Sequence, residues 1–167
     1  MDQPDTPSAG GRIEGWIDFT DRVRATLAMG VSERVDWCLS DPDFSRWPLG
    51  ERGITEALQQ WVLNHPGGRM TLLAARFDEL PRRHPRWLNW RRDWSHRVTC
   101  REAAPEEAGR VRPMLLWPGR VGLRLLDEVS GRGQWTTDPG VLHNWRTEYD
   151  VILQRSSEAM PSTTLGL

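Results

Sequence analysis

The sequence contains no lysine, and all 22 of its basic side chains belong to arginine. Arginine stays protonated in proteins, so it cannot replace lysine as a nucleophile, a Schiff-base former or a general base. Every mechanism that needs a catalytic lysine is therefore excluded. The bias toward arginine is typical of a GC-rich genome and by itself indicates no function.

Long apolar runs and cysteines are scarce as well. No apolar run approaches the roughly 20 residues that cross a bilayer, so we expect no membrane partner. The first residues, MDQPDTPSAGGR, lack the apolar core of a secretory signal, and the two cysteines, Cys38 and Cys100, are fewer than small secreted domains usually carry. We therefore expect a cytoplasmic protein in which both cysteines act as small buried hydrophobes.

Motifs that bind metals or nucleotides are missing from the chain. There is no CxxC, HExxH or HxxxH pattern for a metal ion. The glycine segments GGRIEG, GERG and GRG lack both the strand and helix context of a dinucleotide site and the Lys-Ser/Thr ending of a phosphate-binding loop. We expect no metal and no cofactor.

The length of 167 residues is that of one domain. We predict a single α/β domain over residues 13–155, with a disordered tail at 1–12 and a C-terminal tail at 156–167. In the second tail, Leu165 and Leu167 are the residues that could dock on the domain.

Helical and strand-like periodicities alternate along the domain. Helices are predicted over residues 18–30, from 54 to a stop at Pro66-Gly67-Gly68, within 82–96 with Pro85 at N1, and over 138–154. Strands are predicted over 34–40, 69–76, 96–101, 111–117, 120–127 and 133–137. The first helix is expected to end at Gly30 as a C′ residue, and the last is capped by Asp138 with Pro139 at N1. Its predicted buried stripe consists of Val141, Leu142, Trp145, Tyr149 and Ile152.

This order predicts an α/β fold with a mixed sheet: parallel β-α-β units come first, followed by an antiparallel hairpin and a C-terminal helix. Ligand sites of such sheets form beyond the carboxyl ends of the parallel strands. The residues expected at those ends are Ser40, Asp41, Arg76, Asp78, Arg101 and Glu102. Capping of strands and pairing in solvent is the favoured interpretation. The alternatives are a binding site that uses Arg76 and Arg101, and a hydrolase site of unrecognised type.

The stretch RRHPRWLNWRRDWSH, residues 82–96, concentrates five arginines and three tryptophans. On a helical wheel Trp87, Trp90 and Trp94 fall within an arc of about 60°, and Arg83 joins them. Burial of this face on the sheet is favoured over a platform that stacks bases. His96 lies at the amino end of the following strand, where a structural role is favoured over a catalytic one.

The remaining arginines of the stretch form a basic face that includes Arg82, Arg86 and Arg92. Between residues 82 and 101 there are seven arginines and one acid, Asp93, although the whole chain has a net charge of −1. The face could bind phosphates of a nucleic acid, an acidic protein partner, or acidic segments of its own chain such as EAAPEEAG. Neutralisation within the chain is the favoured interpretation.

The order of motifs resembles a family of uncharacterised proteobacterial proteins over nearly the whole chain. It consists of DFTDRVRATL, a strand, SDPDFSRWPL, an apolar strand, RRHPRWLNWRRDWSHRVTC, a hairpin and a terminal helix that leads into LQRSSEAMPSTTLGL. That family in turn resembles one half of a phospholipase D-type fold. Active members of that superfamily use an HxK motif, followed after four residues by Asp, with histidine as nucleophile and lysine as phosphate clamp.

This chain departs from that motif. The hairpin segment, PMLLWPGRVGLRLLD, contains neither the histidine nor the lysine, and only Asp127 remains. The resemblance therefore implies a degenerate, non-catalytic binding or regulatory module without catalytic residues. It also implies a homodimer, because such folds usually pair two halves. The alternatives are a nucleic-acid-binding protein that uses the basic face of residues 82–92, and a phosphodiester hydrolase with an unrecognised site.

Overall fold

The structure is a computed structural model that describes residues 9–161, so Leu165 and Leu167 lie outside it. Its strands are β1 Gly10–Glu14, β2 Trp37–Asp41, β3 Met70–Ala74, β4 Val98–Ala103, β5 Met114–Trp117, β6 Val121–Asp127, β7 Arg132–Thr136 and β8 Ser156–Ala159. Its α-helices are α1 Trp16–Met29, α2 Arg52–Asn64, α3 Leu80–Arg83, α4 Pro85–Asp93 and α5 Pro139–Gln154. Short 3₁₀ helices span Gly30–Ser32 (η1) and Ala108–Arg110 (η2).

All the strands of the described chain form one mixed sheet with the order β1-β7-β6-β5-β2-β3-β4-β8. The central strands β2, β3 and β4 are parallel, and α2 and the α3–α4 pair connect them, which confirms the two predicted β-α-β units. The neighbours β5, β6 and β7 are antiparallel and follow one another by short connections. The predicted α/β fold class, including the hairpin region and the C-terminal helix, is therefore confirmed.

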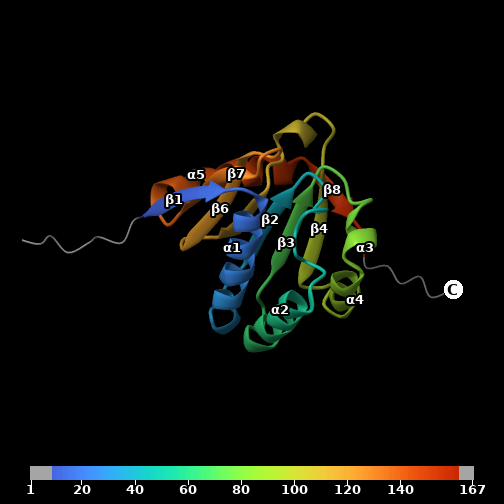
Figure 1. Cartoon of the computed structure of the whole chain (residues 1–167). Coiled ribbons are helices and arrows are strands. Elements are labelled where there is room, and N and C mark those ends of the chain that lie inside the picture. Colours follow the sequence, from blue (N-terminus) through green and yellow to red (C-terminus); the bar gives the residue numbers. More distant parts are fainter. Residues whose placement is uncertain (1–8, 162–167) are drawn as a thin grey trace, which may run out of the picture.

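Helices cover both faces of the sheet (Figure 1). On one face α1, α2 and α4 bury a large core that contains Phe19, Trp61 and Trp87. On the other face α5 packs Trp145 and Tyr149 in a second core. Asp138 caps α5 as expected, because its side chain accepts a hydrogen bond from the N–H of Val141. Both faces of β2 are buried, as is typical of a central strand between two helical layers.

The predicted tails are partly wrong, because both contain strands. Gly10–Glu14 pairs with β7 as β1, and its Ile13 is only 1% exposed. Ser156–Ala159 pairs with β4 as β8. The strands at the two edges of the sheet thus come from segments that the composition assigned to tails, and the ordered domain extends beyond residues 13–155.

Two predicted details of the helices are also wrong. The first helix ends at Met29 with Gly30 as its C-cap, close to the predicted end, but Gly30 has φ −75° and not the left-handed conformation of a C′ glycine, and it begins η1. Glycine is needed there for space, since a Cβ atom would lie 2.2 Å from the ring of Trp37. Pro85 is the first residue of α4, as predicted, but the helical wheel was extended back to Arg83, which belongs to the separate helix α3. Arg83 is therefore exposed and does not join the tryptophan face.

Candidate ligand-binding cleft and the catalytic-motif position

The carboxyl ends of β2 and β3 lie at the same edge of the sheet (Figure 1) and open into a cleft of about 430 Å³. We call it the carboxyl-end cleft. It is lined by Trp16, Asp41, Pro42, Asp43, Ser45, Arg46, Arg76, Pro113, Glu128 and Val129. On one side β2 has a parallel partner and on the other the antiparallel β5, which leaves a crevice at the strand ends. Asp41 and Arg76, both expected at strand ends, therefore meet in one site.

Asp41 ends β2 and organises the loop that forms one wall of the cleft. Its carboxylate accepts hydrogen bonds from the backbone N–H of Asp43 (3.0 Å) and Phe44 (2.7 Å) and from the indole Nε1–H of Trp47 (2.9 Å). Burial nevertheless raises the pKa of Asp41 to about 6, because water no longer solvates its charge. This residue is a structural anchor for the loop and not a free acid.

His84 holds the same loop through two hydrogen bonds of its imidazole ring. The imidazole Nε2–H donates to the carbonyl of Phe44 at 2.7 Å, and Nδ1 accepts the N–H of Gly50 at 3.1 Å. Burial lowers the pKa of His84, which favours the neutral ring that this pair of hydrogen bonds needs. Phe44 itself is fully buried and has a positive φ of 59°, a left-handed conformation that bulky residues rarely adopt.

The charged side chains of the cleft differ in their pairing. The Arg76 guanidinium contacts Asp43 at 3.2 Å and Asp78 at 3.5 Å. Burial acts to raise the pKa of Asp43, but hydrogen bonds from Ser45 and Arg76 outweigh it and lower the pKa. This carboxylate therefore stays charged. Arg46 instead lies over the ring of Trp16, 5.0 Å from its centroid.

Arg46, Trp16 and Glu128 were missed by the sequence prediction. The segment DPDFSRWPLG carried a usable signal, because a turn that directly follows a central strand must border the crevice. Trp16 and Glu128 carried none. The Trp16 indole donates to the backbone carbonyl of Glu128 at 2.7 Å, a contact that joins segments 112 residues apart.

The other arginines proposed for binding lie outside this cleft. Arg101 donates to the side chain and carbonyl of Ser156 and so ties β4 to β8. Arg82 and Arg83 share the carboxylate of Glu79, and Arg86 donates to the carbonyl of Gly50 at 2.7 Å. Within residues 9–161 no ion pair joins these arginines to the acidic segment EAAPEEAG, whose Glu107 pairs with Arg110 and Arg155.

The tryptophan face of residues 82–96 packs on the core, as predicted. Trp87 is fully buried, Trp90 is 8% exposed, and Trp94 packs against the same cluster from just beyond the end of α4. The indoles of Trp90 and Trp94 both donate to the side-chain oxygen of Gln59, at 3.1 and 3.0 Å. A base-stacking platform would need these rings exposed.

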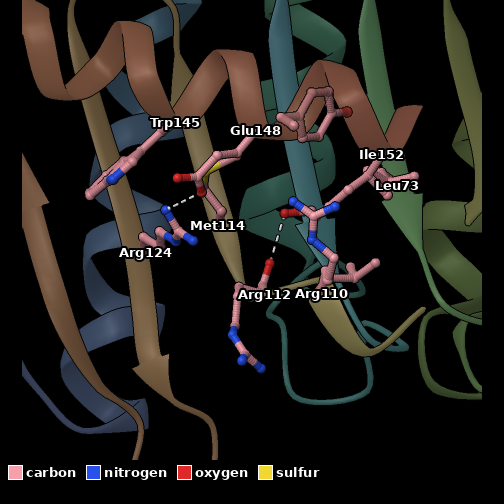
Figure 2. Close-up of a pocket in the computed structure, with 11 residues that line it drawn as sticks. Leu73, Arg110, Arg112, Met114, Arg124, Trp145, Glu148 and Ile152 are labelled. Carbon is pink, nitrogen blue, oxygen red and sulfur yellow. Dashed lines mark hydrogen bonds and ion pairs between the residues drawn. The ribbon is translucent and has the colours of Figure 1, made fainter. Parts of the chain in front are cut away.

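Under α5 there is a second, much smaller cavity of about 30 Å³, drawn in Figure 2. That volume suits about one water molecule. Its polar groups are engaged within the chain: Ser40 donates to the carbonyl of Arg112 at 2.7 Å, and Arg124 pairs with Glu148 at 2.8 Å. We therefore regard this cavity as a packing defect, and the carboxyl-end cleft as the candidate site.

Neither a metal site nor a membrane helix is found in residues 9–161. No group of three or more His, Cys, Asp or Glu side chains there is placed to hold a metal ion. Cys38 and Cys100 are buried, as predicted, and burial raises the pKa of each thiol to about 11. None of the helices in this range is long and apolar enough to span a bilayer.

Comparison with solved structures finds similar folds at low sequence identity. TrmBL2, a DNA-binding archaeal chromatin protein, aligns over 95% of this chain and 57% of its own, with a TM-score of 0.63 and 13% identity. Nuc from Salmonella typhimurium, a phospholipase D family member, aligns over 81% of this chain and 90% of its own, with a TM-score of 0.54 and 7% identity. The chain has a phospholipase D-like fold.

NucT from Helicobacter pylori aligns over 90% of this chain and 98% of its own, with a TM-score of 0.54 and 8% identity. This chain thus spans most of Nuc and NucT but little more than half of TrmBL2. No family model and no curated protein matches the sequence. At such identities the likeness establishes the fold and not the activity.

The segment that the sequence comparison set against the HxK motif forms the strand β6 and the turn before it. Asp127 is the last residue of β6, and its carboxylate accepts hydrogen bonds from the N–H of Val129 and the hydroxyl of Ser130 in the turn that follows. Counted back from Asp127, the motif spacing places the histidine position at Arg120 and the lysine position at Gly122. A Cβ atom on Gly122 would lie 2.9 Å from both Trp145 and Leu142. Figure 2 shows Trp145, which projects from α5 on the same side of the pocket as Arg124 of β6.

Proposed function

We propose that the chain is a non-catalytic binding or regulatory module with a phospholipase D-like fold. The observation that carries the proposal is the packing of Trp145 on Gly122, because it fills the space that a phosphate-clamping lysine would need. The hydrogen bonds of Asp127 to its own turn support the same conclusion. Pairing of two copies, and membership of the proteobacterial family that the motif order resembles, are part of this proposal.

An assay on phosphodiesters tests the absence of catalysis. The wild type is incubated with bis(p-nitrophenyl) phosphate and with generic DNA, beside the Asp127→Asn and Arg120→Ala variants prepared identically. We expect no hydrolysis above that of a buffer blank. Hydrolysis by the wild type that either substitution abolishes would overturn the proposal, because a contaminating nuclease would be equally active in all three preparations.

A second candidate function is nucleic-acid binding through Arg82, Arg86 and Arg92. What favours it is the exposure of all three side chains on the α3–α4 surface, where Glu79 and Asp93 are the neighbouring acids. TrmBL2, which is similar in fold, binds DNA, although this chain corresponds to only 57% of it. Phosphate contacts of this kind depend steeply on salt concentration.

A gel-shift titration at low and moderate salt tests this candidate. If it holds, the wild type binds generic DNA or RNA at low salt, and changing Arg82, Arg86 and Arg92 to Glu abolishes binding. The matched control changes three other exposed arginines, Arg34, Arg69 and Arg120, to Glu, and therefore carries the same net charge. No binding by the wild type at low salt, or equal losses in both triple variants, would retire the candidate.

A further inference from the structure

Hydrogen bonds within the chain hold the loop beside the carboxyl-end cleft, residues 41–47, in one conformation. Three donors converge on the Asp41 carboxylate, and His84 holds the carbonyl of Phe44, so residues 41–47 have few ways to rearrange. The left-handed backbone of Phe44 is strained, and such strain persists only where the surroundings enforce it. Such local strain concentrates at binding sites, where it presents the neighbouring side chains in a defined position.

The loop presents Asp43, Ser45 and Arg46 to the cleft. Among residues 9–161, no carboxylate lies within ion-pair distance of the Arg46 guanidinium. Its contacts are the ring of Trp16 and a long hydrogen bond of 3.5 Å to the carbonyl of Glu128. A guanidinium whose neighbour is an indole ring and not a carboxylate keeps several N–H donors available for an anion.

The remaining lining decides what kind of anion fits. The cleft volume of about 430 Å³ is within the range of small-molecule sites. The carboxylates of Asp43 and Glu128 also line it, and they would repel a polyanion such as nucleic acid. Pro42, Pro113 and Val129 supply apolar surface for the uncharged part of a ligand.

We propose that the carboxyl-end cleft binds a small organic anion, whose carboxylate or phosphate group is held by Arg46 with Arg76 as a second donor. Asp43 and Glu128 accept hydrogen bonds from hydroxyl or amino groups on the same molecule. The proposal rests on the proposed binding function and names a ligand class and a site for it. It is independent of whether the chain hydrolyses phosphodiesters, so the two proposals fail separately.

Titration with small anions, followed by two-dimensional ¹H–¹⁵N NMR, tests the site. The indole N–H of Trp16 is a reporter inside the cleft, and its signal is identified as the one that the Trp16→Phe variant lacks. The probes are inorganic phosphate, glycerol 3-phosphate, acetate and lactate, each added at constant ionic strength against sodium chloride. Phosphate-selective and carboxylate-selective responses distinguish the two ligand sources.

We expect the Trp16 indole signal to move and to saturate with one of these two groups of probes. The Arg46→Gln variant should bind that probe at least about tenfold more weakly, because it loses a charge-assisted contact. Arg52→Gln is the matched control, since Arg52 is also exposed and does not line the cleft. Arg76→Gln provides a second variant with an intermediate loss.

Three results would overturn the proposal. The first is a Trp16 signal that no probe moves. The second is a signal that sodium chloride moves as far as the probes do. The third is unchanged affinity in Arg46→Gln, with a thermal unfolding profile like that of the wild type.

Discussion

Asp41 is a single carboxyl group on which the candidate site depends. It is buried, it anchors the loop of residues 41–47, and its pKa is about 6 in the folded chain against an ordinary value of 3.8. Between these two values the folded state holds a proton that the unfolded state has released. The protein should therefore gain stability from this group as the pH falls from about 7 to about 4, and lose that gain as the pH rises through about 6.

The prediction is measured by urea unfolding at a series of pH values in that range. At about 1.4 kcal/mol per pKa unit, the contribution of Asp41 is on the order of 3 kcal/mol. Asp41→Asn cannot titrate, so the stability difference between wild type and variant should change with pH in this window. Asp78→Asn, at an exposed carboxyl of the same rim, is the matched control for the loss of one carboxyl group. Parallel pH profiles for wild type and Asp41→Asn would contradict the burial of a titrating Asp41.

Individual arginines show why residue roles were hard to predict. Arg97 donates to the carbonyls of Val62, His65 and Gly68, and so satisfies the end of α2. Arg91 is buried and donates to the carbonyls of Val98 and Met160. Both belong to the basic cluster that suggested phosphate binding. Because the chain has no lysine, a buried structural cation and an exposed one are both arginine in the sequence. Only the fold shows which arginines are buried.

At the scale of elements, patterns within one segment predicted the fold well. The periodicity of α1, α2 and α5, and the apolar run of β3, follow from burial against the sheet and need only local sequence. The helical wheel failed where it assumed continuity: the 84–85 junction separates α3 from α4, so angles measured across it have no meaning. Proline at the first position of α4 was the local sign of that boundary.

Elements whose partners are distant in the sequence were not predictable in this way. The β1 strand, GGRIE, has one buried apolar side chain, and it pairs with a strand more than 110 residues away. The cleft was not predictable for the same reason, because its residues Trp16, Arg46 and Glu128 come from three separate segments of the sequence. The sequence located the rim residues Asp41 and Arg76 through the rule for strand ends, but not the residues that complete the site.

At the scale of the whole molecule, the first and last strands of the described chain belong to the same sheet. The strand from the N-terminal side closes one edge of the sheet, and β8 closes the other. Near one edge Ile13 is 1% exposed, and toward the other Trp90 is 8% exposed. Both side chains belong to the same large core. A domain with such a continuous core should unfold in a single step.

We therefore expect Ile13→Ala and Trp90→Ala to lower the stability of the same transition. The expected losses are about 2–5 kcal/mol for Ile13→Ala and about 3–5 kcal/mol for Trp90→Ala, as for other large buried side chains. Chemical unfolding followed by both tryptophan fluorescence and far-ultraviolet circular dichroism measures them. Ile17→Ala is the matched control, because the same residue type is 81% exposed four positions along, and its loss should stay below about 0.5 kcal/mol. Equal losses of stability for Ile13→Ala and Ile17→Ala would mean that β1 does not pack on the core. Two separate unfolding transitions would mean that the two sides of the sheet unfold independently.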